Sequence, residues 1–367
     1  EPPPAEPPSA EPPPAAPPFS MRAALIPIPL AFAPRDTLPA WSSQLAGALE
    51  AALACSTLSR VYLYFCGGWA AAPLTKESIR ALSIAYDCLP PAGAQLDVVP
   101  LLPSAGWSPS CLGSLADLST LLLTEAPEAC PETERAVSEL AEVRRVANLP
   151  PLQTVVTPGG VPPPVMARPD AGNPDGYLEY ARLAVGGTFD RLHAGHRLLL
   201  AVSALASAHT VYLGVTGDEL LAKKANAQLL WPFEKRAAVA ADFIRLVKPA
   251  LNVEVSALLD PQAPPKAATM AEISALVISR ETTAGGAKVV EMRKARGIDA
   301  PLTLVLVDLV GAASQSSDAM KLSSSLLREV EAVALASNVS SEDTKRSASE
   351  REDTQMPRET KIRRQDG

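Results

Sequence analysis

Two histidines of this chain are spaced so that both could contact one phosphate group. The chain has three histidines, and His193 and His196 lie in the run Gly-Gly-Thr-Phe-Asp-Arg-Leu-His-Ala-Gly-His at 186–196. The glycines allow a sharp turn that approaches a ligand closely. His196 begins an apolar helical pattern, and the free N–H groups at a helix N-terminus attract anions. The spacing predicts a phosphate site with imidazole donors.

Other sites built on glycine-rich turns need strings that this sequence lacks. Neither G-x-G-x-x-G nor G-x-x-x-x-G-K-[ST] occurs in the chain, although dinucleotide sites and P-loops require them. Metal binding by His193 and His196 remains an alternative, but their spacing is not that of H-E-x-x-H and no third ligand is evident. A pair of surface histidines without a function is the other alternative. We expect no metal bound by protein ligands alone.

The elements that would position this motif alternate regularly along the second half of the chain. Short runs rich in β-branched residues predict five strands, and amphipathic or apolar stretches between and after them predict helices. The strands are expected at 182–187, 210–216, 252–257, 275–279 and 302–308, and the helices at 196–208, 232–247, 286–296 and 323–334. This alternation predicts an α/β domain, a Rossmann-like doubly wound parallel five-stranded sheet. Ligands bind such sheets beyond the carboxyl ends of the strands.

A smaller α/β domain of unknown role is expected before this one, with disordered segments at both ends of the chain. Its strands are predicted at 23–32, 60–65, 96–102 and 119–124, and its helices at 41–54, 76–87 and 132–147. The segment 21–33 could also be a short signal-peptide core, which leaves two interpretations open. The expected divisions are a Pro-rich disordered segment at 1–20, a first domain at 21–149, a linker at 150–176, a second domain at 177–336 and a charged disordered tail at 337–367.

Composition excludes several classes of partner. The net charge of −7 argues against a nucleic-acid binder, which would need a basic surface. No apolar run reaches the roughly 20 residues that span a bilayer. The five cysteines form no C-x-x-C pair, so neither a disulfide framework nor a zinc site is indicated. A reducing compartment, the cytoplasm, is therefore expected.

The run at 186–196 resembles the signature of the HxGH nucleotidyltransferase superfamily. Further similarities point to one branch, the eukaryotic-type phosphopantetheine adenylyltransferases, here without the C-terminal dephospho-CoA kinase domain. The similarities follow in order at 214–216, 220–224, 232–236, 247–249, 259–261, 281–286 and 321–328. Together they cover about 182–330, and an ordered series of this kind is far more specific than a single motif.

The resemblance implies that ATP and 4′-phosphopantetheine react to give dephospho-CoA and pyrophosphate. In that family the 4′-phosphate attacks the ATP α-phosphate in line. The nucleophile is already an anion, so positioning and charge neutralisation carry the catalysis. Mg²⁺ is expected to be carried by ATP rather than by a cage of protein ligands. No P-loop kinase motif occurs in this chain, so conversion is expected to stop at dephospho-CoA.

The resemblance also implies roles for particular residues. His196, His193 and Lys224 are the expected catalytic residues, with Lys223 as the alternative lysine. Arg293 is expected either to bind substrate or to be an ordinary exposed helix arginine, and Asp190 could serve only to cap the turn. The expected substrate- and nucleotide-binding residues are Gly186, Gly187, Thr188, Phe189, Asp190, Arg293, Ser323, Ser324, Ser325 and Arg328.

Two positions depart from the family pattern. Arg280 stands where an acidic residue is usual and Val290 where an asparagine is usual, so the adenine and ribose contacts stay open. A sibling cytidylyltransferase or nicotinamide-mononucleotide adenylyltransferase is the nearest alternative function. A non-catalytic adaptor that keeps the fold is the alternative from another class. The oligomeric state is not predicted.

Overall fold

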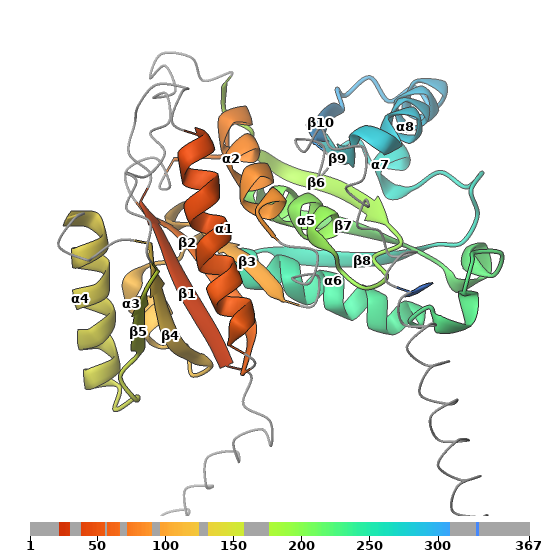
Figure 1. The fold of residues 1–367 in the computed structure, drawn as a ribbon. Helices are drawn as coiled ribbons and strands as arrows, with labels where there is room; N and C mark the ends of the chain where they lie inside the picture. The colour runs from red at the N-terminus through yellow and green to blue at the C-terminus, as the bar shows by residue number, and fades with distance from the viewer. Residues whose placement is uncertain are drawn as a thin grey trace, which may run out of the picture.

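The chain folds into two parallel five-stranded sheets covered by helices (Figure 1). A computed structural model describes residues 22–29, 38–55, 57–66, 72–89, 96–124, 131–157, 176–308 and 328–329. The predicted disordered ends at 1–20 and 337–367 lie outside the described residues, as does most of the predicted linker.

The first sheet has the strand order β3-β2-β1-β4-β5, with all neighbours parallel. Its strands are β1 (Arg22–Pro29), β2 (Leu58–Cys66), β3 (Asp97–Leu101), β4 (Leu118–Leu123) and β5 (Gln153–Val156). Its helices are α1 (Leu38–Ala54), α2 (Lys76–Asp87), α3 (Pro109–Gly113) and α4 (Pro131–Val146). The α/β class is confirmed, and the strand interpretation of 21–33 holds for Arg22–Pro29, the central strand.

Strand β5 was not expected, because it lies within the stretch that we interpreted as a linker. It is a four-residue edge strand with mostly exposed side chains. Such a strand is held by backbone hydrogen bonds to β4 rather than by burial, so it carries little hydrophobic signal. Ordered structure therefore continues past residue 150, to Thr157.

The second sheet confirms the predicted five-stranded parallel fold, in the order β10-β9-β6-β7-β8. Its strands are β6 (Tyr180–Gly187), β7 (Ser207–Thr216), β8 (Asn252–Leu258), β9 (Ala275–Ser279) and β10 (Thr303–Val307). Its helices are α5 (Ala194–Ala206), α6 (Phe233–Val247), α7 (Lys266–Thr269) and α8 (Thr283–Ala295). Strand order reverses at β6, so the loop after β6 occupies the switch point where ligands bind.

In the first half, α1 begins three positions earlier than expected and the five-residue helix α3 was not expected. In the second half, three helices differ from the sequence-based expectation. Helix α5 begins at Ala194, with His193 as its N-cap residue, rather than at His196. Helix α8 begins three positions earlier than expected, and the single-turn helix α7 was not expected. Of the helix predicted at 323–334, only Arg328 and Glu329 belong to the described residues.

Helix α5 packs between the two halves of the molecule. All of its residues are buried except Gly195 and His196 in its first turn. It contacts β6 and β7 of its own sheet, and α2 and β3 of the first half (Figure 1). A helix that is apolar on all faces is buried on all faces, which explains the sequence LLLAVSALA. Buried apolar residues of both halves form one connected cluster.

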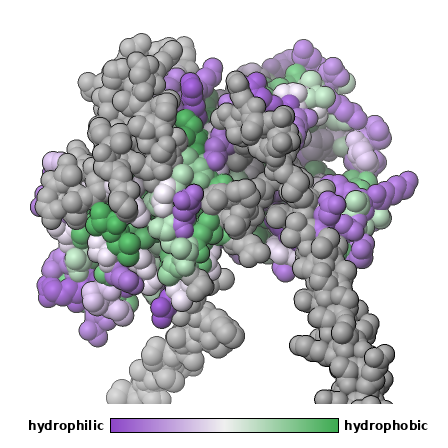
Figure 2. All heavy atoms as spheres, in the orientation of Figure 1, coloured by the Kyte–Doolittle hydropathy of each residue, from purple (hydrophilic) through white to green (hydrophobic). Residues whose placement is uncertain are grey.

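The surface of the molecule carries both hydrophilic and apolar side chains (Figure 2). Figure 2 shows hydrophilic side chains around the outer edges of the described surface and apolar residues nearer its middle. Among the described helices, none combines the length and the apolar character that a membrane span requires.

Candidate active site

The two histidines of the motif lie face to face at the start of α5. Their rings stack with centroids 4.0 Å apart and planes 29° apart. Phe189 lies beneath them, with its ring centroid 5.4 Å from that of His196. A Cβ atom at Gly195 would lie only 3.2 Å from Cε1 of His193. The glycine between the histidines therefore lets the His193 ring fold back over the helix start.

The loop that presents this pair is held in a strained conformation. Phe189 and Arg191 have φ angles of 52° and 46°, in the left-handed region that non-glycine residues rarely adopt. The Phe189 ring is fully buried, and a Cβ at Gly187 would approach its Cζ to 2.9 Å. Such strain tends to occur at functional sites, where the surrounding structure maintains it.

His196 is uncharged at neutral pH. Burial lowers the pKa of His196 well below its usual range, and the nearby His193, Arg197 and Lys224 lower it further, against an opposing contact with the Arg191 backbone. Its Nδ1 is buried and has no hydrogen-bond partner among the described residues. A neutral imidazole has one N–H group, and a bound anion could accept a hydrogen bond from it.

Lys224 contacts the loop that follows β6. Its Nζ lies 3.4 Å from Oγ1 of Thr188, the residue that follows β6. Burial lowers the pKa of Lys224, and the neighbouring Arg328 adds to this effect. The sequence-predicted Thr188, His193, His196 and Lys224 therefore meet at the carboxyl end of β6.

Lys224→Ala is expected to reduce turnover by about 10–10²-fold, because it removes a cation positioned beside Thr188 in the loop after β6. Lys223→Ala is the matched control, since Lys223 is an exposed neighbour that makes no hydrogen bond to Thr188 among the described residues and is expected to stay within about twofold of the unmodified protein. Steady-state turnover of both variants measures the difference. Equal losses would show that the wrong lysine was assigned.

Asp190 and Arg328 form a buried ion pair instead of facing a ligand. Nη1 of Arg328 lies 2.7 Å from Oδ2 of Asp190, with side-chain exposures of 1% and 0%. The Asp190 carboxylate also accepts from Arg191 at 3.0 Å and from the Trp231 backbone N–H at 3.1 Å. Nε of Arg328 donates to the carbonyl of Ala225. We interpret both residues as positioning groups that hold the loop.

Arg293 is buried, so the alternative of an exposed helix arginine is wrong. It is 2% exposed and donates through Nη1 and Nη2 to four backbone carbonyls. These carbonyls belong to Ala267, Met270, Ala271 and Ala300. Its Nε is buried without a partner among the described residues. The Arg293 guanidinium therefore joins α8 to α7 through hydrogen bonds to backbone carbonyls. These bonds argue against a role in binding substrate.

Arg236 is a positioning residue that the sequence reasoning missed. Its guanidinium is fully buried and donates to the carbonyls of Thr188 at 2.6 Å and Thr216 at 2.8 Å, and it pairs with Asp218 at 2.6 Å. It thereby ties the ends of β6 and β7 together. A signal was present: Arg236 shares a helical face with Ala240, Phe243 and other apolar residues of α6. A charged residue on an apolar face needs buried partners.

Several other expected residues have a clear location. Gly186 and Gly187 end β6. Arg280 directly follows β9 and forms an exposed ion pair with Asp308, which directly follows β10. The three serines Ser323, Ser324 and Ser325 lie outside the described residues.

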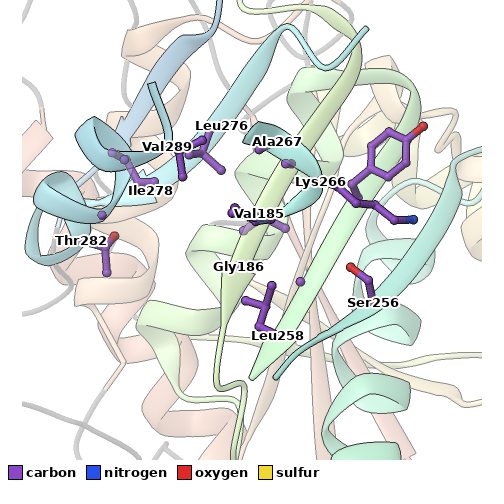
Figure 3. A pocket seen from close by; sticks show the side chains of 16 residues that line it. Val185, Gly186, Ser256, Leu258, Lys266, Ala267, Leu276, Ile278, Thr282 and Val289 are labelled. Atoms are coloured by element: carbon purple, nitrogen blue, oxygen red, sulfur yellow. The ribbon is translucent and has the colours of Figure 1, made fainter. Parts of the chain in front are cut away.

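A cavity of about 250 Å³ lies beside the end of β6. Figure 3 shows Val185, Leu258, Leu276 and Ile278 around it, together with Gly186, the first residue of the run 186–196. Ser256, Thr282 and Lys266 supply its polar groups. An apolar cavity with a few polar groups is typical of a small-molecule site.

Among the described residues, no group of three or more His, Cys, Asp or Glu side chains could hold a metal ion. Asp190 adjoins the histidine motif in sequence, but its carboxylate is taken by Arg191 and Arg328.

The fold and the site define a protein of the nucleotidyltransferase class, and residues 184–330 match the family described as Cytidylyltransferase-like. The chain is 37% identical over 147 residues to the phosphopantetheine adenylyltransferase of Saccharomyces cerevisiae, covering 40% of this chain and 47% of that protein. It is 38% identical over 150 residues to an uncharacterised protein of Schizosaccharomyces pombe, covering 40% and 46%. The chain thus spans about half the length of these two relatives.

An archaeal relative is covered almost completely. The phosphopantetheine adenylyltransferase of Pyrococcus furiosus is 33% identical over 150 residues, which are 41% of this chain and 88% of that protein. Through its second half, this chain belongs to the phosphopantetheine adenylyltransferase family.

Proposed function

We propose that this chain transfers the AMP part of ATP to 4′-phosphopantetheine, giving dephospho-CoA and pyrophosphate. The observation that carries the proposal is the meeting of His193, His196, Lys224 and Thr188 at the carboxyl end of β6. A phosphate chain placed there would receive imidazole, ammonium and hydroxyl donors together with the start of α5. The names of the archaeal and yeast relatives support the same reaction.

The cavity supports phosphopantetheine as the substrate that supplies the attacking phosphate. Its Gly186 end adjoins Thr188, and most of its lining is apolar. A pantetheine arm is a long, mostly apolar chain with amide groups, and it fits such a lining better than a second nucleotide would. We therefore place the arm in the cavity and the 4′-phosphate against Thr188.

The residues divide the catalytic work between them. Thr188 and the Gly187 and Phe189 backbone orient the attacking phosphate, and Lys224 bridges that phosphate and the ATP α-phosphate. His196 donates to the α-phosphate as charge builds up on its oxygens, and His193 contacts the phosphates beside it. No side chain needs to remove a proton, because the attacking phosphate is already ionised. Orientation and charge stabilisation supply the rate.

Mg²⁺ belongs with ATP in this proposal. Triphosphate oxygens are ligands that Mg²⁺ prefers, and when bound it would neutralise part of their charge. The serines Ser323 to Ser325 are proposed to bind the same phosphates. We also propose that the reaction occurs in the cytoplasm, since five cysteines without a C-x-x-C pair suit a reducing compartment.

The direct test is pyrophosphate release from ATP with phosphopantetheine. Parallel reactions replace ATP with CTP, or phosphopantetheine with nicotinamide mononucleotide, and mass spectrometry identifies the product. The expected result is dephospho-CoA from the first pair only. A preference for CTP or for nicotinamide mononucleotide would assign a sibling reaction, and no turnover with any pair would favour an adaptor.

The pH dependence of kcat/KM should show two limbs, because this quantity reports the pKa values of the free reactants. Activity should fall below about pH 6, where a phosphate monoester takes up its second proton. His196 should add no limb near pH 6, because burial holds its pKa well below its usual range. Activity should also fall at alkaline pH as Lys224 loses its charge, earlier than an ordinary lysine would, because its pKa is lowered.

The variant Lys224→Arg identifies the source of the alkaline limb. An arginine keeps its charge above pH 12, so the alkaline limb of this variant should move to higher pH while the acid limb stays. An unmoved alkaline limb would contradict the assignment to Lys224.

A further inference from the structure

A charged contact joins the first half of the chain to the helix that carries the histidines. Arg197 directly follows His196 in the first turn of α5, and its side chain is only 9% exposed. Its Nε donates to Oδ1 of Asp97, at the start of β3, over 3.1 Å. Nη1 of Arg197 is buried and has no hydrogen-bond partner among the described residues. Among the described residues, Asp97 is therefore the counter-charge of this guanidinium.

Asp97 is itself held firmly by its own half. Its second oxygen, Oδ2, accepts from Nε and Nη2 of Arg60, each at 2.8 Å. Arg60 belongs to β2, so two adjacent strands of the first sheet fix the carboxylate. The next acidic residue of this network, Asp117, accepts from the Tyr62 hydroxyl at 2.8 Å and lies 3.8 Å from Arg60. Asp117 makes no hydrogen bond or ion pair with Arg197 among the described residues, so it is a close comparison for Asp97.

Arg197 is close enough to the site to affect it. It is adjacent in sequence to His196, and its charge is one of the causes that lower the pKa of that histidine, after burial and His193. The rest of α5 is packed on all sides, so only its first turn, at Gly195 and His196, borders the site. The orientation of that turn depends on the contacts that its side chains make. The Arg197 side chain makes its contact with Asp97, which belongs to the first sheet.

We propose that Asp97 is a positioning residue of the adenylyltransferase site, which holds the first turn of α5, and with it His196, through Arg197. The first half of the chain thus contributes to a site that lies wholly in the second half. This inference rests on the proposed function for its kinetic consequences, but the placement of the His196 ring is measurable without any turnover.

A second contact between the two halves allows a control experiment. It distinguishes the positioning of His196 from the general packing of the first half against the second. The indole Nε1 of Trp107 donates to the carbonyl of Val247 over 3.0 Å, at the C-terminal end of α6. Helix α6 is about 20 Å long at 1.5 Å per residue, so Val247 lies far from the N-terminal end of α6, where Arg236 contacts Thr188. Trp107→Phe removes this bond and loosens the contact between the halves without touching α5. It controls for a general effect of weaker docking.

The experiment compares Asp97→Asn and Asp97→Ala with Asp117→Asn and Trp107→Phe in the full chain. With three histidines in the sequence, the ring protons of His196 can be resolved by NMR and assigned with the His193→Gln and His209→Gln variants. Both Asp97 variants should shift the His196 resonances, and the two controls should leave them in place. Asp97→Asn keeps the shape of the side chain, so it serves if Asp97→Ala fails to fold.

The kinetic arm measures kcat and KM separately. Asp97→Ala should lower kcat by about 10–10²-fold with KM for ATP changed less than about threefold, because a misplaced catalytic group costs rate more than binding. Arg197→Lys should retain more activity than Arg197→Met. If the unmodified protein has no adenylyltransferase activity, the proposed function fails and the NMR comparison alone decides this inference. Unmoved His196 resonances in both Asp97 variants would overturn it.

Discussion

His196→Ala is expected to fold normally and to lose about 10²–10⁴-fold in turnover, the scale for removing one preorganised donor to a developing oxyanion. The imidazole stacks on His193 at 4.0 Å and contacts the buried Phe189 ring. Its position at the start of α5, the helix after the switch-point strand β6, places it where the ATP α-phosphate is proposed to bind. Because the residue retains some exposed surface, truncation leaves no large internal cavity.

His209→Ala is the matched control for this loss. His209 is exposed near the start of β7, at the opposite end of that strand from the site, and should stay within about twofold of the unmodified protein. Single-turnover kinetics with saturating ATP isolates the chemical step, and thermal melting verifies folding. Near-normal turnover in a folded His196→Ala protein would remove His196 from the mechanism.

Asp190→Ala is expected to lower the free energy of unfolding by about 3–5 kcal/mol, because it removes one partner of a fully buried ion pair. It also removes the acceptor for the Trp231 backbone N–H and one acceptor of Arg191. Turnover should fall as well, since the loop that carries the histidines loses its anchor. Denaturant unfolding at neutral pH measures the loss of stability.

Two further variants test the cause of that loss. Asp190→Ala combined with Arg328→Met should recover part of the stability, because the double variant also removes the buried charge that Asp190 neutralised. Asp242→Ala removes an exposed partner of Arg245 and should change the free energy of unfolding by less than about 0.5 kcal/mol. A double variant less stable than Asp190→Ala would mean that Arg328 acts through contacts other than this ion pair.

The elements around the site were predictable because their signals are local. Alternation of short β-branched runs with apolar helical stretches predicted all five strands of the second sheet and placed the motif after β6. The spacing of His193 and His196 predicted that both would reach one place at a helix start. Strand β5 escaped prediction because an exposed edge strand has no buried face.

Roles that depend on burial were not predictable in the same way. Arg293, Asp190 and Arg328 looked like ligand-binding groups by type and position, yet each is at most 2% exposed and makes hydrogen bonds to the protein itself. Arg236 was assigned no role, although it joins the ends of β6 and β7. A charged side chain looks the same in a sequence whether its partner is a phosphate or a backbone carbonyl far along the chain.

The amino-acid order was sufficient for the fold class, the position of the histidine motif after β6 and the family resemblance, because periodicity and motif spacing act over a few neighbouring residues. The strand orders, the buried ion pair of Asp190 with Arg328 and the contact of Asp97 with Arg197 emerged only from the folded chain. Asp190 and Arg328 are 138 positions apart in the sequence, and Asp97 and Arg197 are 100 positions apart. Contacts over such separations are set by how the sheets and helices pack, and no local pattern encodes them.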